Sequence, residues 1–219
     1  MKRFLPFIIV ILVALLAIGG GTFLYFSKRS ANAPPKFTRP AGDAGGIVHT
    51  LGPADAAVTL EEFGDFQCPP CGQLSEPINQ LQKQHNLRVI YRNFPLANHQ
   101  WAKDAACAAE AAGKQGKFWP MHDLLFREQA VWSQSTDALA LFSAYAGMLQ
   151  LDLDQFKKDM ESQEVQEKVE LDRRRGAAIG VKTTPTIFLN NEALTVEQMN
   201  PTQLPEMVEA AVKKAKPSS

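Results

Sequence analysis

The order of predicted elements indicates an α/β fold with a large helical insertion. A strand, a helix and a second strand follow one another between residues 57 and 92, which is a β-α-β unit. A stretch of about 80 residues with helical spacing and few strand signals follows. Strand character then returns, and an amphipathic helix completes the pattern. We therefore predict a sheet packed against helices and interrupted by a helical subdomain over about residues 97–180.

The individual elements follow from apolar periodicity. Asn190-Asn191 is a plausible tight hairpin turn between the last two strands. In chain order, strands are predicted at 57–63, 87–92, 185–189 and 193–196, and helices at 69–85, 99–113, 118–128, 136–149, 153–162, 164–179 and from 202 onward.

The length and composition of the chain are those of one medium-sized globular domain with an additional segment. The chain has 219 residues, 45% of them hydrophobic, which excludes disordered and collagen-like classes. The formal net charge is 0, but residues 31–219 carry 19 Lys and Arg against 23 Asp and Glu, a net charge of −4. Because phosphate binding requires a basic face, we expect no nucleic-acid partner.

Residues 1–29 have the features of a membrane anchor. The 23 residues from Phe4 to Phe26 carry no charge, and a helix of that length crosses a bilayer at about 1.5 Å per residue. The alternative is a cleaved secretory signal, with a cleavage motif at Ala31-Asn32-Ala33. We expect an uncleaved transmembrane helix, because the apolar run is long for a signal and Pro34 would follow the cut.

Two further ranges complete the predicted organisation. Residues 30–46 are rich in small residues, Pro and Gly and lack periodicity, so we expect a flexible linker. Residues 47–219 then form the folded domain.

The Cys68-Pro69-Pro70-Cys71 motif follows a predicted strand and opens a predicted helix. A helix N-terminus offers partial positive charge and unpaired N–H groups, which favour a thiolate, so Cys68 is the predicted nucleophile. Cys71 lies on the same helical face and can attack a mixed disulfide formed at Cys68. A bond that closes so short a loop contributes little loop entropy and is more useful when made and broken.

Other interpretations of the cysteines stay open. The pair can be a static disulfide or half of a zinc site, although Cys107 is the only other cysteine. Pro69 and Pro70 lack N–H groups and stiffen the turn, and these two effects can oppose each other in the redox equilibrium. Cys107 lies in an alanine-rich helix, where core packing is expected and linkage to a partner is the alternative.

Four motifs occur in order along the chain. They begin at Glu62, Tyr91, Gly116 and Gly180 and read EFxxFxCPxC, YRNFPL, GKFWxMHDLL and GVKTTPTIF. Together they resemble the DsbA-like branch of the thioredoxin superfamily over about residues 47–213. The resemblance implies a thioredoxin-like fold with an inserted helical subdomain. It also implies thiol–disulfide exchange outside the cytoplasm, with no cofactor beyond the redox-active disulfide.

The resemblance assigns site residues position by position. Cys68 matches the attacking cysteine and Cys71 its buried resolving partner. Pro185 matches the proline that is cis in this superfamily, and it would leave the backbone of Thr184 free to pair with a substrate strand. Glu62 matches an acid near the active site, which could accept the proton of Cys71, with a pKa raised by burial.

Several assignments stay open at the level of sequence. An exposed strand position is the alternative for Glu62, and the neighbouring Glu61 leaves the face uncertain. Pro70 replaces the histidine that DsbA carries between its cysteines, which leaves the oxidising strength open. Residues 173–175 are three arginines, expected as a solvated helix end. The four histidines are expected to be structural or surface groups.

We predict a disulfide oxidase that introduces disulfides into exported proteins with free cysteines. A membrane quinone-linked partner resembling DsbB would reoxidise the Cys68-Cys71 pair. The catalytic domain is expected outside the cytoplasm, on the periplasmic or cell-surface side, and bound to the membrane through its N-terminal helix. The alternatives are a reductase or isomerase of the same compartment and a thiol-dependent metal chaperone.

Overall fold

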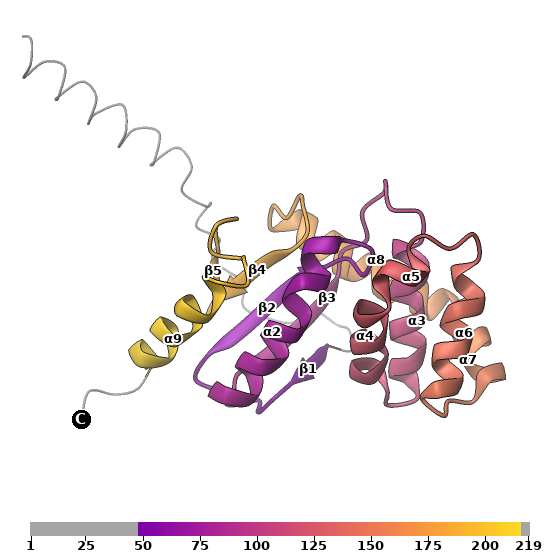
Figure 1. Ribbon diagram of the computed structural model, residues 1–219, viewed down its shortest axis with the longest axis horizontal. Helices are drawn as coiled ribbons and strands as arrows, with labels where there is room; N and C mark the ends of the chain where they lie inside the picture. Colours follow the sequence, from indigo (N-terminus) through magenta and orange to yellow (C-terminus); the bar gives the residue numbers. More distant parts are fainter. Residues whose placement is uncertain (1–47, 216–219) are drawn as a thin grey trace, which may run out of the picture. The chain divides into compact units, whose positions relative to one another are not determined.

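The strands of this chain form a five-stranded mixed sheet in a computed structural model that describes residues 48–215 (Figure 1). The sheet order is β1-β3-β2-β4-β5, in which β2 and β3 are parallel and the other neighbouring pairs are antiparallel. This confirms the α/β class. The strands are β1 (His49–Leu51), β2 (Thr59–Gly64), β3 (Arg88–Asn93), β4 (Thr186–Leu189) and β5 (Glu192–Ala193).

The helices fall into a group near the sheet and a group inserted between β3 and β4. Figure 1 shows α3 to α7 gathered beside the sheet, at the right of the view, with α2 in front of the sheet. The helices are α2 (Pro69–His85), α3 (Ala102–Lys114), α4 (Phe118–Arg127), α5 (Gln129–Trp132), α6 (Ala138–Met148), α7 (Leu153–Met160), α8 (Gln163–Ala178) and α9 (Leu204–Ala215).

Most predicted elements are present within a few residues. Helix α2 has its predicted bounds, and Asn190 and Asn191 have φ values of 49° and 71°, the left-handed conformation that a tight hairpin turn requires. The short β1 and α5 were not predicted, because elements of three and four residues are too short to show a period. Strand β5 is shorter than predicted, at two residues.

Apolar side chains fill three clusters. Helices α2 and α9 pack on the sheet through residues such as Leu74 and Val208. A second cluster joins Phe63 and Phe94 to Val181 and Phe188. The third is the core of the inserted helices, where all the alanines of α3 are buried and allow neighbouring helices a close approach.

No helix within residues 48–215 is long and apolar enough to cross a membrane. The predicted anchor of residues 1–29 and the predicted linker of residues 30–46 lie outside the described residues.

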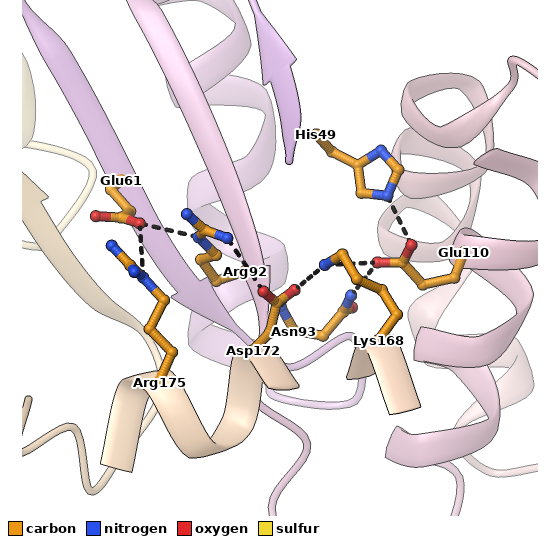
Figure 2. Close-up of polar contacts among 8 residues, drawn as sticks. All are labelled: His49, Glu61, Arg92, Asn93, Glu110, Lys168, Asp172 and Arg175. Atoms are coloured by element: carbon orange, nitrogen blue, oxygen red, sulfur yellow. Dashed lines mark hydrogen bonds and ion pairs between the residues drawn. The ribbon is translucent and has the colours of Figure 1, made fainter. Parts of the chain in front are cut away.

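A network of buried charges connects the sheet to helix α8 (Figure 2). The Arg92 side chain of β3 donates from Nε to Glu61 Oε1 at 2.9 Å and from Nη1 to Asp172 Oδ1 at 3.2 Å. Asp172 Oδ2 in turn accepts from Lys168 Nζ at 2.6 Å. Arg175 lies in the last turn of α8, as predicted for a helix end, but its side chain is only partly exposed and its Nε lies 3.8 Å from Glu61 Oε1.

The same network continues to helix α3 and strand β1 (Figure 2). Glu110 Oε1 accepts from Asn93 Nδ2 at 2.6 Å, and Lys168 Nζ lies 3.6 Å from it. Glu110 Oε2 lies 2.7 Å from His49 Nε2. Because an unpaired buried charge is costly, these contacts fix how the inserted helices lie against the sheet.

We expect Arg92→Met to destabilise the fold strongly, because it leaves Glu61 and Asp172 buried without their shared cation. The free energy of unfolding should fall by roughly 3 kcal/mol in urea titrations. The matched control is Arg173→Met, which removes an exposed pair with Glu170 and should cost less than about 1 kcal/mol. Equal losses in the two variants would contradict this account of the network.

Candidate active site

Cys68 occupies the N-cap of α2, and the turn of residues 65–67 joins it to the end of β2. Its backbone is extended, with φ −80° and ψ 116°, and Pro69 and Pro70 fill the first two helical positions. Proline is tolerated there because the N–H groups of the first helical residues have no acceptor within the helix, so their absence breaks no helical hydrogen bond. Cys68 keeps 5% of its surface exposed, whereas Cys71 is fully buried at 0%. Both are free thiols in this structure.

The Thr184-Pro185 segment lies against the first cysteine. The Cys68 thiol donates to the carbonyl oxygen of Thr184 at 3.3 Å, across 116 positions of sequence. The Thr184-Pro185 peptide bond is cis, and Pro185 is buried. The structure thus brings together the two segments that the sequence predicted to meet.

The pKa values of the two cysteines are shifted in opposite directions. The hydrogen bond with the side chain of Cys71, followed by one with the side chain of Thr184, outweighs burial and lowers the pKa of Cys68 from 9.0 to about 6. Burial raises the pKa of Cys71 well above its ordinary value, and the hydrogen bond with Cys68 adds to this. At neutral pH Cys68 is therefore the thiolate and Cys71 the protonated thiol.

The side chain of Glu62 lies on the face of β2 that is turned toward the two cysteines of α2. Burial, followed by the charge of Cys68, raises the pKa of its carboxyl group from 4.5 to about 8. Its Oε1 atom is buried and has no hydrogen-bond partner among the described residues. Glu61 pairs instead with Arg92, on the opposite face, because successive strand residues alternate. This answers the open question of which glutamate faces the site, and it excludes an exposed position for Glu62.

Tyr91 is a neighbour of Glu62 that sequence reasoning did not single out. It is the register partner of Glu62 in the parallel β2–β3 pair. Burial, with a contribution from Glu62, raises the pKa of its hydroxyl group well above the ordinary value. A Cβ atom at Gly64 would come within 2.6 Å of the Tyr91 ring, so the glycine makes room for it.

Asp65 holds the turn that leads to Cys68. Its Oδ2 atom accepts from the backbone N–H of Leu96 at 2.9 Å and lies 2.7 Å from His99 Nδ1. Its Oδ1 atom accepts from the backbone N–H of Gln67 at 2.7 Å. These bonds tie the turn to the loop after β3, and they give His99 the structural role expected for it.

Gln129 of α5 also reaches this turn. Its side-chain Nε2 donates to the carbonyl oxygens of Phe66 and Cys68 at 2.6 and 2.9 Å. Nothing in the sequence singled out this residue, because it lies in the inserted helices, 61 positions after Cys68.

Cys107 is a core residue of α3, as predicted. It is 4% exposed, and burial raises the pKa of its thiol to about 12. Among residues 48–215 no group of three or more His, Cys, Asp and Glu side chains is placed to hold a metal ion.

Comparisons with known proteins agree with this geometry. A family model described as "Thioredoxin" matches residues 45–210. The crystal structure of oxidised BdbD from Bacillus subtilis is similar with a TM-score of 0.65 and 25% identity, over 75% of this chain and 92% of that one. A thioredoxin-like oxidoreductase from Silicibacter pomeroyi DSS-3 has a TM-score of 0.62 and 27% identity, over 78% of this chain and 94% of that one.

Curated relatives give a different kind of match. The Na(+)/H(+) antiporter NhaA 1 of Salinispora arenicola is 37% identical over 195 residues, which covers 82% of this chain and 29% of the antiporter. The chain therefore spans less than a third of that relative's length.

The fold and the cysteine pair define a thiol–disulfide oxidoreductase. Within that class the chain belongs to the thioredoxin family.

The buried carboxyl group of Glu62 should make stability depend on pH. In the unfolded chain it loses its proton near pH 4.5, but in the folded chain only near pH 8. The contribution of Glu62 to the stability of the folded state therefore falls as the pH rises between these values, by up to about 4 kcal/mol. Glu62→Gln carries no such proton and should lose less stability between pH 5 and pH 8. Urea titrations of both reduced proteins at the two pH values test this, and equal losses would contradict it.

Proposed function

We propose that this chain is a disulfide oxidase that donates its Cys68-Cys71 disulfide to exported proteins with free cysteines. The observation that carries the proposal is the placement of Cys68 at the N-cap of α2 beside the fully buried Cys71, which lowers the pKa of Cys68 and raises that of Cys71. A cysteine of low pKa is a good leaving group, and a stable thiolate favours the reduced form of the pair, which makes the disulfide oxidising.

The reaction consists of two thiol–disulfide exchanges. A substrate thiolate attacks the sulfur of Cys68, so a mixed disulfide forms, the Cys68-Cys71 bond breaks and Cys71 leaves and takes up a proton. A second substrate thiolate then attacks the substrate sulfur of the mixed disulfide, and Cys68 leaves as a thiolate. The substrate loses two electrons as its disulfide forms, and the cysteine pair gains them.

Glu62, Thr184 and Pro185 support these exchanges in the proposal. Glu62 has a pKa of about 8 beside the cysteines, so it can give a proton to Cys71 as that sulfur leaves and accept it back on reoxidation. The Thr184 carbonyl oxygen already faces the sulfur of Cys68, and Pro185 has no N–H group to compete for a substrate strand.

Location and partners follow from the direction of the reaction. We place the domain outside the cytoplasm, where disulfides persist, and on the membrane through residues 1–29. A membrane quinone-linked protein resembling DsbB would take the electrons from the reduced pair. The acidic body of the chain supports the absence of a nucleic-acid partner.

The reduction potential of the pair tests the proposed direction. The chain is equilibrated with glutathione buffers, and its thiols are trapped by alkylation. We expect a value between about −120 and −180 mV, the range of strong oxidants and isomerases. A value near about −270 mV would instead favour a reductase.

Serine variants should separate the roles of the three cysteines. Cys68→Ser should abolish oxidation of a reduced substrate peptide, because the attacked sulfur is gone. Cys71→Ser should form a stable mixed disulfide through Cys68 with a peptide that carries a disulfide, because the Cys68 thiolate attacks that bond, one peptide thiol leaves and no Cys71 remains to resolve the product. Mass spectrometry detects this adduct. Cys107→Ser is the matched control and should keep full activity, because Cys107 is buried with a pKa of about 12. Activity retained in Cys68→Ser would end this mechanism.

A further inference from the structure

The side chain of Gln129 connects the inserted helices to the backbone of the redox turn. One amide nitrogen, Nε2, uses both of its hydrogens, on Phe66 O at 2.6 Å and on Cys68 O at 2.9 Å. These carbonyls stand at the two sides of Gln67, just before α2 begins. The ring of Phe66 is packed into the inserted helices as well, 4.9 Å from the ring of Phe126.

Cys68 depends on its backbone for its orientation. It caps α2 without any side-chain capping bond, and Pro69 and Pro70 offer no N–H groups that could hold the turn. Its carbonyl oxygen accepts the first helical bond from Gly72 N at 3.2 Å, and Gln129 adds a second donor. A donor on that oxygen also offsets the negative end of the carbonyl dipole next to the sulfur.

Gly72 is the position that admits the Gln129 side chain. A Cβ atom there would come 2.8 Å from Gln129 Oε1. Alanine is otherwise the better residue in a helix, and Gly72 lies within α2. The space beside this glycine is therefore occupied by the carboxamide that holds Cys68.

We propose that Gln129 is a positioning residue of the redox site, which holds the Cys68 carbonyl and so keeps the Cys68 sulfur where its thiolate is stabilised. The inference rests on the proposed function, because it concerns the same cysteine pair. It also assigns the inserted helices a part in the chemistry, through α5.

The test is the rate at which iodoacetamide alkylates Cys68 in the reduced full-length chain, measured from pH 5 to pH 9. Cys71 and Cys107 have raised pKa values, so Cys68 reacts first. In Gln129→Ala the acid dissociation constant of Cys68 should fall about fivefold, the factor that corresponds to one lost hydrogen bond. Because the pKa of Cys68 in the unaltered chain is about 6, the rate at pH 6 should then fall about threefold. The rate at pH 9 should stay unchanged, because Cys68 is then a thiolate in both proteins.

Two variants control for shape and charge. Gln129→Glu keeps the shape but replaces the donor by a carboxylate, so the rate at pH 6 should fall further than in Gln129→Ala. Gln134→Ala removes the same side chain from an exposed position in the turn after α5 and should leave the profile unchanged. Glu62 and Asp65, the charged groups that act on Cys68, are intact in all three variants.

A double-mutant cycle with Gly72 tests the contact itself. Gly72→Ala should displace the carboxamide and shift the profile as Gln129→Ala does. In the Gln129→Ala background the same change should produce no further shift. A profile in Gln129→Ala identical to that of the unaltered chain overturns the inference, whatever happens to its unfolding midpoint, and so do additive shifts in the cycle.

The failure of this inference can be told apart from failure of the proposed function. If the unaltered chain exchanges with glutathione but Gln129→Ala keeps its alkylation profile, only the positioning role fails. If the pair does not exchange, the oxidase proposal fails, and the alkylation profiles still decide whether Gln129 positions Cys68.

Discussion

The chemistry of this chain depends on where one sulfur atom is held. Cys68 Sγ lies at the N-terminus of α2, beside Cys71 and 3.3 Å from the carbonyl oxygen of Thr184. Helix α2 brings the two sulfurs together because the cysteines are three residues apart in one helical turn. Thr184 lies beside Cys68 only because β4 pairs with β2 in the sheet. The surroundings of the Cys68 sulfur are therefore set both by helix α2, which supplies Cys71, and by the pairing of β4 with β2, which brings Thr184 beside it.

The inserted helices also help to hold the turn that carries Cys68. Asp65 ties the turn to the loop after β3, Phe66 enters the aromatic cluster of α4, and Gln129 holds the carbonyl groups. Behind the sheet, the buried charges from Glu61 to Glu110 fix α3 and α8. Buried ion pairs of this kind add little net stability. Another arrangement of the helices would leave these charges buried without partners, which is costly, so the pairs define one arrangement.

The sequence predicted correctly those features of the structure that depend on residues close together in the chain. The strand-to-helix position of Cys68, the bounds of α2 and the Asn190-Asn191 turn depend on neighbouring residues and were predicted correctly. The partners of Gln129 and Arg92 depend on the packing of segments 61 and 80 positions away, which no local pattern reports. The face of Glu62 needed the register of β2, because one residue of slip exchanges it with Glu61.

Glu61 and Glu62 show how the same residue type is used for structure and for chemistry. Glu61 is buried opposite Arg92 and has its charge compensated. Glu62 is buried without a cation, and its pKa of about 8 shows that the fold accepts a loss of stability at this position. A buried carboxyl group with a pKa of about 8 beside a cysteine pair has the properties of a group that transfers protons near neutral pH. In the reaction that we propose, Cys71 is buried and must gain and lose a proton, so it is the neighbour that Glu62 would serve.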